Sequence, residues 1–286
     1  MSRVYTADVT VRHDELDAFG RVHPAVYLRY LAHAAVEASA DAGFDAAWYG
    51  GAGGMWLVRR STFTVADPAR AGDRLTIRTW VEDFRRVRSH RRYTIESGDG
   101  RRCLDALTDW VYVDATTGRP RRVPADLEAA FGTRTGNGPE RAPWVGAPAP
   151  AAPARSSHRV RLSEVDPIGH VNNAVYLDIA SQAVLDAFEA AGWPLERMVE
   201  RGGAPLLAAA DVEYLEGARY GDRLETATWF EAAADTLAAH QHIIRTGSDR
   251  PLVRAVTRWC WPDAAPGGHG TIPPGLLAAV GSLVAA

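Results

Sequence analysis

The residues best suited to chemistry form a short run, DPIGHVNNAVY, that begins at Asp166. A carboxylate can act as a general base or a nucleophile, and an imidazole such as that of His170 can hold a proton or a water molecule. Asn172 and Asn173 are good helix starters, and the first turn of a helix offers unbonded N–H groups and a positive dipole end. The spacing alone favours a turn or capping role for Asp166. The same spacing also sets a carboxylate beside groups that could stabilise an oxyanion.

An altered form of this run occurs earlier in the chain. The stretch that opens with Asp17, DAFGRVHPAVYL, matches DPIGHVNNAVYL from Asp166 at an offset of 149 residues. The same offset, applied without a gap, also aligns the GDRL segments at 72–75 and 221–224, the pair Trp110 and Trp259, and the pair Pro124 and Pro273. One register held over more than a hundred residues indicates a tandem duplication.

Between the two copies lies a segment, residues 132–157, that is rich in Pro, Ala and Gly and lacks apolar periodicity. This composition predicts an extended linker over the surface. The expected organisation is therefore one domain at residues 1–131, the linker at 132–157 and a second domain at 158–286. Each domain then has an ordinary size.

Within a copy, the pattern predicts one long helix followed by strands. A short strand is expected at 5–13, a turn at 17–20 and a helix at 23–42, ended by Gly43. Segments rich in Val, Ile, Thr, Trp and Tyr predict strands at 56–65, 74–84, 87–97 and 102–114. A long helix with a wide apolar face and an antiparallel meander form an α+β unit, in which the helix covers one face of the sheet.

The motif resembles the signature of the hotdog-fold thioesterases, which include the 4-hydroxybenzoyl-CoA thioesterase-like and acyl-ACP thioesterase groups. The residues that carry the resemblance are Asp166, Gly169, His170, Val171, Asn172, Asn173 and Tyr176. The Gly-Asp-x-Leu segments are similar to a strand-entry turn of the same family, so the resemblance covers both copies. It implies a tandem double hotdog, each unit a long central helix wrapped by an antiparallel sheet, and it leaves room for a homodimer of double hotdogs.

The resemblance also implies roles for the motif. Asp166 stands where the family carries its catalytic carboxylate, and His170 would hold Asp166 or the attacking water. Asn172 and Asn173 would orient the water or the thioester carbonyl, although at least one of them is expected simply to start the helix. Gly169 and Tyr176 are the accompanying substrate-binding candidates. A plain turn histidine is the alternative for His170.

The first copy departs from this pattern. Asp17 and Gly20 are kept, but Arg21 replaces the histidine and His23-Pro24 replaces the two asparagines. Proline has no backbone N–H, so Pro24 removes one donor from the helix start. The second copy is therefore the expected main site. Asp17 is a secondary catalytic candidate, unless it only pairs with Arg21, and Gly20 and His23 are substrate-binding candidates.

A dense basic run, RRVRSHRR, occupies residues 85–92 of the first copy. Arg85, Arg86 and Arg88 could contact the phosphates of coenzyme A or the acidic surface of an acyl carrier protein. The alternative is a solvated strand that protects the edge of a sheet.

Composition excludes several classes of protein. With 47% hydrophobic and 23% charged residues the chain can build a core, so it is not intrinsically disordered. A net charge of −3 argues against a nucleic-acid partner, and there is no apolar stretch of 18 residues to cross a membrane. Two cysteines supply neither a disulfide framework nor a metal cluster. We expect a cytoplasmic protein with no metal and no cofactor.

The leading hypothesis is therefore an acyl-CoA or acyl-ACP thioesterase, a hydrolase in which a carboxylate assists the attack of water. A hotdog hydratase or dehydratase is less well supported, because that branch resembles Asp-x-Asn-Pro-x-His and here four steps, without Asn-Pro, separate Asp166 from His170. A non-catalytic acyl-thioester binding protein is the remaining alternative. The sequence leaves the acyl group and the choice of carrier open.

Overall fold

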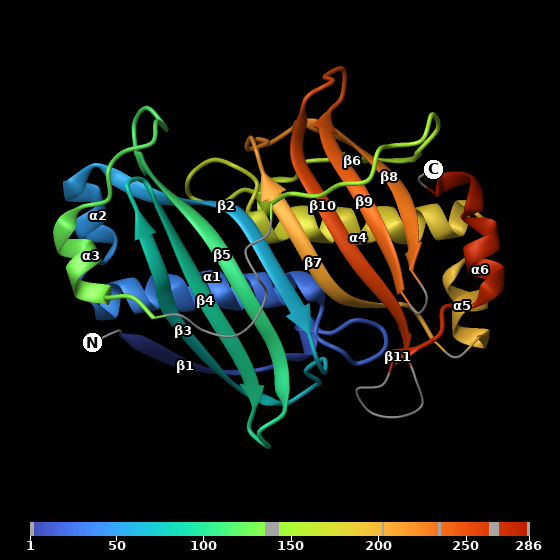
Figure 1. The fold of residues 1–286 in the computed structure, drawn as a ribbon, viewed down its shortest axis with the longest axis horizontal. Helices are drawn as coiled ribbons and strands as arrows, with labels where there is room; N and C mark the ends of the chain where they lie inside the picture. Colours follow the sequence, from blue (N-terminus) through green and yellow to red (C-terminus); the bar gives the residue numbers. More distant parts are fainter. Residues whose placement is uncertain (1–2, 135–142, 202, 234–235, 263–268, 285–286) are drawn as a thin grey trace. The chain divides into compact units, whose positions relative to one another are not determined.

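The chain folds into two units that repeat one order of elements (Figure 1). The structure is a computed structural model that describes residues 3–134, 143–201, 203–233, 236–262 and 269–284. Unit 1 comprises Met1–Arg141 and unit 2 comprises Ala142–Ala286. Part of the expected linker, residues 135–142, lies outside the described residues, and the first strand of unit 2 begins at Ala154, inside the expected linker segment.

In its described residues, unit 1 has five antiparallel strands, one long helix and two short ones. The sheet has the order β1-β3-β4-β5-β2, so β4 lies between two neighbours and β1 is at the end of the series. The elements are β1 (Val4–Thr10), a 3-10 turn (His13–Glu15), α1 (Pro24–Asp41), α2 (Ala46–Ala52), β2 (Gly54–Val65), β3 (Arg74–Arg85), β4 (Arg88–Ser97), β5 (Arg102–Asp114) and α3 (Ala125–Phe131).

Unit 2 repeats this plan. Its sheet has the order β7-β10-β9-β8-β6, and the short strand β11 pairs with β10. The elements are β6 (Ala154–Arg159), a 3-10 turn (Leu162–Glu164), α4 (Asn173–Ala190), α5 (Leu195–Glu200), β7 (Leu206–Tyr214), β8 (Arg223–Ala233), β9 (Thr236–Arg245), β10 (Pro251–Pro262), β11 (His269–Gly270), α6 (Pro274–Ala279) and a 3-10 turn (Gly281–Leu283).

The predicted helix at 23–42 is found as α1, and the four predicted strands are found as β2 to β5. Helix α1 buries Leu28, Leu31 and Ala35, which recur at helical spacing, and it packs against β3 and β1. Gly43 follows the helix with a φ of +92°, the left-handed conformation that glycine adopts at low cost. The first strand ends at Thr10 rather than residue 13, because residues 13–15 form a 3-10 turn.

The offset between equivalent residues of the two units changes by one residue within the sheet. Strand β3 has an irregularity between Val81 and Asp83 that β8 lacks, so unit 1 carries one extra residue there. Ile77 faces Ile95, whereas Thr226, the counterpart of Ile77, faces Ile243. Strand β4 therefore corresponds to β9 at an offset of 148 residues. The gapless offset of 149 is wrong over this strand.

Each unit has its own apolar core and one buried cysteine. In unit 2 the rings of Phe188 and Phe230 stack with their centres 5.5 Å apart. In unit 1 an aromatic cluster forms around Phe44 and Phe131, whose ring centres lie 6.4 Å apart. Cys103 in unit 1 and Cys260 in unit 2 are buried and are not joined in a disulfide. No helix in the described ranges combines the length and apolar composition needed to span a membrane.

Replacing Phe188 by Ala will destabilise the protein by about 3–5 kcal/mol, because a buried aromatic ring is lost and the remaining cavity has to be accommodated. Urea unfolding monitored by circular dichroism measures this loss. The control is Val36→Ala, at a helical position that is 62% exposed, which will change the free energy of unfolding by less than about 0.5 kcal/mol. Equal effects of the two substitutions would contradict the assigned core.

Candidate active site

The motif of unit 2 forms a tight loop in front of α4. The N–H of Asp166 donates to the carbonyl of His170 at 2.9 Å, and the N–H of Gly169 donates to the carbonyl of Asp166 at 2.9 Å. Val165 and Val171 form a bridge that closes the loop. Gly169 has a φ of +84°, which most side chains would strain. The loop therefore presents the side chains of Asp166 and His170 on a fixed backbone.

The carboxylate of Asp166 keeps one oxygen available. Its Oδ1 accepts a hydrogen bond from the N–H of Ile168 at 3.0 Å, which folds the loop back on itself. Its Oδ2 accepts no hydrogen bond from any residue that the structure describes. The side chain is partly exposed, so water can reach this oxygen. Asp166 is thus a turn aspartate, as its spacing suggests, whose second oxygen has no partner within the described ranges.

The equivalent carboxylate in unit 1 is fully engaged. Oδ1 of Asp17 accepts from the N–H groups of Phe19 and Arg21 at 2.8 and 3.0 Å. Oδ2 accepts from Nε of Arg21 at 2.8 Å, and the two side chains form an ion pair. The expected alternative, an Asp17 that pairs with Arg21, is what the structure contains. Gly20 has a φ of +75° and forms the same turn as Gly169.

His170 replaces Arg21 and makes a different contact. Its ring lies against Gly217, where a Cβ atom would come within 2.7 Å of His170 Cγ. A side chain at position 217 would therefore displace the ring. The ring nitrogens of His170 form no hydrogen bond with a described residue. Gly217 escaped the sequence analysis because Pro68 occupies the matching position of the first copy.

The start of α4 supplies the second feature of the site. Asn172 is the N-cap residue, and its side chain accepts a hydrogen bond from the N–H of Ala174 at 3.0 Å. Asn173 occupies the first helical position, and its own N–H donates to none of the described residues. The expectation that one asparagine starts the helix holds for Asn172. In unit 1, His23 provides no side-chain cap, and Pro24, at the helix start, has no N–H.

A buried tyrosine ties the motif loop to the helix. The hydroxyl of Tyr176 accepts a hydrogen bond from the N–H of Ala218 at 2.7 Å, and the carbonyl of Ala218 accepts from the N–H of Val171 at 2.8 Å. Tyr176 is 2% exposed, and burial raises the pKa of its hydroxyl to about 12. Tyr176 was a candidate for substrate binding. The contacts shown are structural ones that hold the site together.

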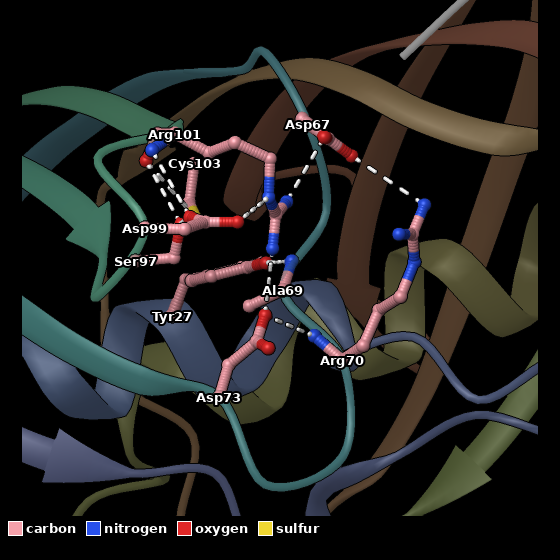
Figure 2. Close-up of polar contacts among 9 residues, drawn as sticks. All are labelled: Tyr27, Asp67, Ala69, Arg70, Asp73, Ser97, Asp99, Arg101 and Cys103. Carbon is pink, nitrogen blue, oxygen red and sulfur yellow. Dashed lines mark hydrogen bonds and ion pairs between the residues drawn. The ribbon is translucent and has the colours of Figure 1, made fainter. Parts of the chain in front are cut away.

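Unit 1 repeats this arrangement, and an arginine fixes the neighbouring turn. Tyr27 accepts from the N–H of Ala69 at 2.8 Å (Figure 2). Arg101 binds Asp67, Asp73 and Asp99 at 2.9, 2.9 and 3.2 Å. Figure 2 shows the guanidinium of Arg101 at the centre of these carboxylates. Asp73 also accepts from the N–H of Arg70, which closes the Gly-Asp turn.

The same turn in unit 2 is held by an arginine from another strand. Asp222 accepts from the N–H of Arg219 at 3.0 Å and from Nε of Arg245 at 3.0 Å. Nη1 of Arg245 binds Glu216 at 2.9 Å. Burial alone would raise the pKa of Asp222, but the hydrogen bonds from Arg219 and Arg245 hold it below its ordinary value. Arg245 ends β9, whereas Arg101 precedes β5, so the repeat alignment could not reveal this shared role.

The basic run of unit 1 lies at the opposite end of its strands. Arg85 and Arg88 flank the β3–β4 hairpin and pair with Asp83 and Asp109 at 3.3 Å each. Strand β3 spans 12 residues between this hairpin and the Gly-Asp turn, about 36 Å at about 3.3 Å per step. In unit 1, Arg85, Arg86 and Arg88 are therefore not brought together with Asp17, Gly20 and His23.

The interpretation of this run as an edge strand is wrong, because β4 lies between β3 and β5. Among the described residues, no three His, Cys, Asp or Glu side chains gather in a way that could hold a metal ion.

A long helix on an antiparallel sheet, repeated in tandem and preceded each time by the same loop, defines the hotdog-type thioesterase fold. The chain belongs to the thioesterase-like superfamily, whose family model matches residues 11–131 and again residues 160–280. The resemblance of the Asp-x-x-Gly-His-Val-Asn-Asn motif to this family is thereby confirmed.

Individual relatives agree with this assignment. The chain is 29% identical over 126 residues to the chloroplastic acyl-acyl carrier protein thioesterase ATL2 of Arabidopsis thaliana, a match that covers 44% of the chain and 66% of that relative. A Lactobacillus plantarum protein described as an oleoyl thioesterase shares the fold with a TM-score of 0.77, 19% identity and coverage of 95% of this chain and 98% of that one. The 12:0-ACP thioesterase of Umbellularia californica gives a TM-score of 0.71, with 16% identity and coverage of 90% and 93%.

Replacing Tyr176 by Phe will destabilise unit 2, because the buried N–H of Ala218 loses its acceptor. The cost of leaving such a group unsatisfied is about 1–3 kcal/mol. Thermal unfolding will show the loss as a lower Tm, while Tyr220→Phe, at a position that is 62% exposed, will leave the Tm unchanged. An unchanged Tm for Tyr176→Phe would show that the hydrogen bond between Ala218 and Tyr176 does not stabilise unit 2.

The contribution of Asp222 to stability will depend on pH. Because its pKa is depressed in the folded state, its charged form stabilises the protein above the unfolded value of about 3.9 and this stabilisation is lost as the pH falls through the folded value. Asp222→Asn will therefore be less stable than wild type at pH 7, and the difference will shrink at pH 3. Urea unfolding at both pH values measures this, with Asp249→Asn, at an exposed position, as the control. If the stability difference between wild type and Asp222→Asn is larger at pH 3 than at pH 7, the pKa of Asp222 is not lowered in the folded state.

Proposed function

We propose that the protein hydrolyses acyl thioesters of coenzyme A or of an acyl carrier protein, and that the motif loop of unit 2 is the working site. The observation that carries this proposal is the presence of two available groups before and at the start of α4. Within the described part of the chain, one carboxylate oxygen of Asp166 and the backbone N–H of Asn173 have no hydrogen-bond partner. Unit 1 lacks both groups, because Arg21 binds Asp17 and Pro24 has no N–H.

These groups suit hydrolysis of a thioester. Asp166 accepts a proton from water as the water oxygen attacks the carbonyl carbon. The negative charge that develops on the carbonyl oxygen is stabilised by the N–H of Asn173 and by the positive end of α4, a helix of 18 residues. The carbon–sulfur bond then breaks, and the departing sulfur takes the proton from Asp166. The products are a carboxylic acid and a thiol.

The other motif residues position these groups. His170, held against Gly217, can orient the attacking water through a ring nitrogen. Gly169 and Asn172 shape the loop and cap the helix, and Tyr176 fixes the loop to the helix.

The names of the relatives support thioesters as substrates. The Arabidopsis relative and the Umbellularia structure are both acyl carrier protein thioesterases by name, so acyl-ACP is the first carrier to test beside acyl-CoA. Arg85, Arg86 and Arg88 remain the proposed contacts for the phosphates or the acidic carrier surface. The carboxylates that already pair with Arg85 and Arg88 would have to release them.

Asp166→Asn will lower kcat/KM for thioester hydrolysis by about 10²–10⁴-fold, the usual contribution of a general base. Release of free thiol from a panel of acyl-CoA and acyl-ACP substrates measures the activity. Asp17→Asn tests unit 1 in parallel and will lower the rate less than about tenfold, because Arg21 already neutralises that carboxylate. A large loss with Asp17→Asn alone would move the site to unit 1.

A second variant tests the stabilisation of the oxyanion by the N–H of Asn173 separately from the general-base role of Asp166. Asn173→Pro gives unit 2 the helix start of unit 1, in which proline is structurally accepted but donates no hydrogen bond. It will lower kcat while leaving the fold intact by circular dichroism. Full activity in both Asp166→Asn and Asn173→Pro would refute the proposed mechanism.

A further inference from the structure

Unit 1 contains a cavity of about 300 Å³ that is partly open to solvent. It lies at the end of α1 beside α2 and α3, the helices that Figure 1 shows at this end of unit 1. Its walls come from the sheet and from all three helices and are mainly apolar and aromatic. Trp56 and Trp110 of the sheet line it, as do Phe44 and Phe131 and the last turns of α1 from Ala35 to Ala40. A volume of this size holds about ten non-hydrogen atoms if each takes about 30 Å³, the share of a liquid water molecule.

Two charged side chains line this cavity: Asp45, which is exposed and caps α2 through the N–H of Trp48, and Arg91, which is buried. Arg91 on β4 is 7% exposed, and no carboxylate among the described residues forms an ion pair with it. Its Nη1 donates to Oγ1 of Thr79 at 3.4 Å, a long contact, and its guanidinium lies 4.9 Å from the ring centre of Phe131. Burying an unpaired cation is costly, so a group that compensates it is expected.

The neighbouring basic residues of the same strand are compensated. Arg92 binds Glu82 at 2.9 Å, and His90 lies between Asp83 and Asp109. Successive side chains of a strand point to opposite faces of the sheet, so Arg91 lies on the face opposite His90 and Arg92. Ser89, two residues before Arg91, lines the same cavity, and its side chain carries a neutral hydroxyl donor.

Comparison of the two units shows that the unit with the cavity is also the unit with the buried arginine. Ser39 and Val81 line the cavity, and their counterparts in unit 2 are Phe188 and Phe230, whose stacked rings fill unit 2 at this place. Arg91 pairs across the sheet with Val81, whereas Ala239 pairs with Phe230. Unit 2 thus has two rings and an alanine where unit 1 has space and a guanidinium. If the cavity were only a packing defect, there would be no reason for a guanidinium to occupy the same place.

We propose that this cavity binds an apolar carboxylate, whose anionic group pairs with Arg91 while its chain or ring fills the apolar walls. A guanidinium binds a carboxylate through two parallel hydrogen bonds. A single arginine neutralises a monoanion fully, but it would leave a phosphate dianion with uncompensated charge in an apolar site. The carboxylate belongs either to a free acid of medium length or to the far end of a dicarboxylic acyl chain on a thioester. The binding itself does not require the proposed hydrolysis.

Octanoate, with ten non-hydrogen atoms, is the probe for this site. Titration calorimetry, supported by the fluorescence of Trp56 and Trp110, will show octanoate binding at least tenfold more tightly than octan-1-ol. Arg91→Met will weaken octanoate at least tenfold and change octan-1-ol little. The matched control, Arg92→Met, removes the neighbouring cation from the other face and will leave octanoate affinity unchanged.

Filling the cavity and measuring the unfolding temperature test the proposal in two further ways. The double variant Ser39→Phe, Val81→Phe gives unit 1 the rings of unit 2 and will abolish binding of both ligands. Arg91→Met will unfold at the same or a higher temperature without ligand, because an uncompensated buried charge is removed. A lower unfolding temperature would show that Arg91 is a structural residue compensated within the protein, against the proposal.

Binding of octanedioyl-CoA and octanoyl-CoA distinguishes the two sources of the carboxylate. If Arg91→Met weakens octanoate alone, the ligand is a free acid. If it weakens octanedioyl-CoA and spares octanoyl-CoA, the ligand is a terminal carboxylate. If neither carboxylate loses affinity, the proposal is wrong, whatever the outcome for thioester hydrolysis.

Discussion

In each unit three separate segments meet at the backbone of one alanine, Ala69 in unit 1 and Ala218 in unit 2. In unit 2 the carbonyl of Ala218 accepts from the motif loop through Val171, and its own N–H donates to the hydroxyl of Tyr176 on α4. The loop that carries Ala218 is closed in turn by Asp222 and Arg245. Because these contacts are buried and directional, they fix the motif loop relative to the start of α4. The placement of Asp166 near the helix start depends on them.

The two units share this backbone arrangement but differ in the side chains that it carries. In unit 2, among the residues that the structure describes, one carboxylate oxygen of Asp166 and the N–H of Asn173 have no hydrogen-bond partner. In unit 1 the same backbone is kept by Tyr27 and Ala69, while Arg21 occupies the carboxylate and Pro24 removes the donor. Unit 1 has a cavity and a buried guanidinium where unit 2 has two stacked rings and an alanine. The two copies therefore share one backbone arrangement but differ in their polar groups and in their cores.

Much of the fold followed from patterns in the sequence. Helical spacing located α1, strand composition located β2 to β5, and the repeat implied the same elements in unit 2. The pairing of Asp17 with Arg21 was expected only as the alternative to a catalytic role for Asp17, and the structure contains it. The short helices α2 and α3 were not predicted, since seven residues each give too little periodicity to distinguish a helix from a loop.

The site and the cavity depended on details that no local pattern carries. The basic run was interpreted as one patch, but the pleat of β4 sends Arg91 inward and pairs Arg92 on the other face. The irregularity near Val81 shifts the repeat by one residue, so the gapless alignment matched Arg91 with His240 instead of Ala239. Gly217 packs against His170 through a long-range contact, which leaves no signal in a repeat.

The two buried cysteines give the chain a separate chemical reporter in each unit. Cys103 lies in unit 1 and Cys260 in unit 2, and both are fully buried. Burial raises the pKa of the Cys103 thiol, so the reactive thiolate is scarce while the unit stays closed. Alkylation of either thiol therefore requires the surrounding structure to open, and its rate reports the free energy of that opening. Peptide mapping of the labelled chain would separate the stability of the two units without any substitution.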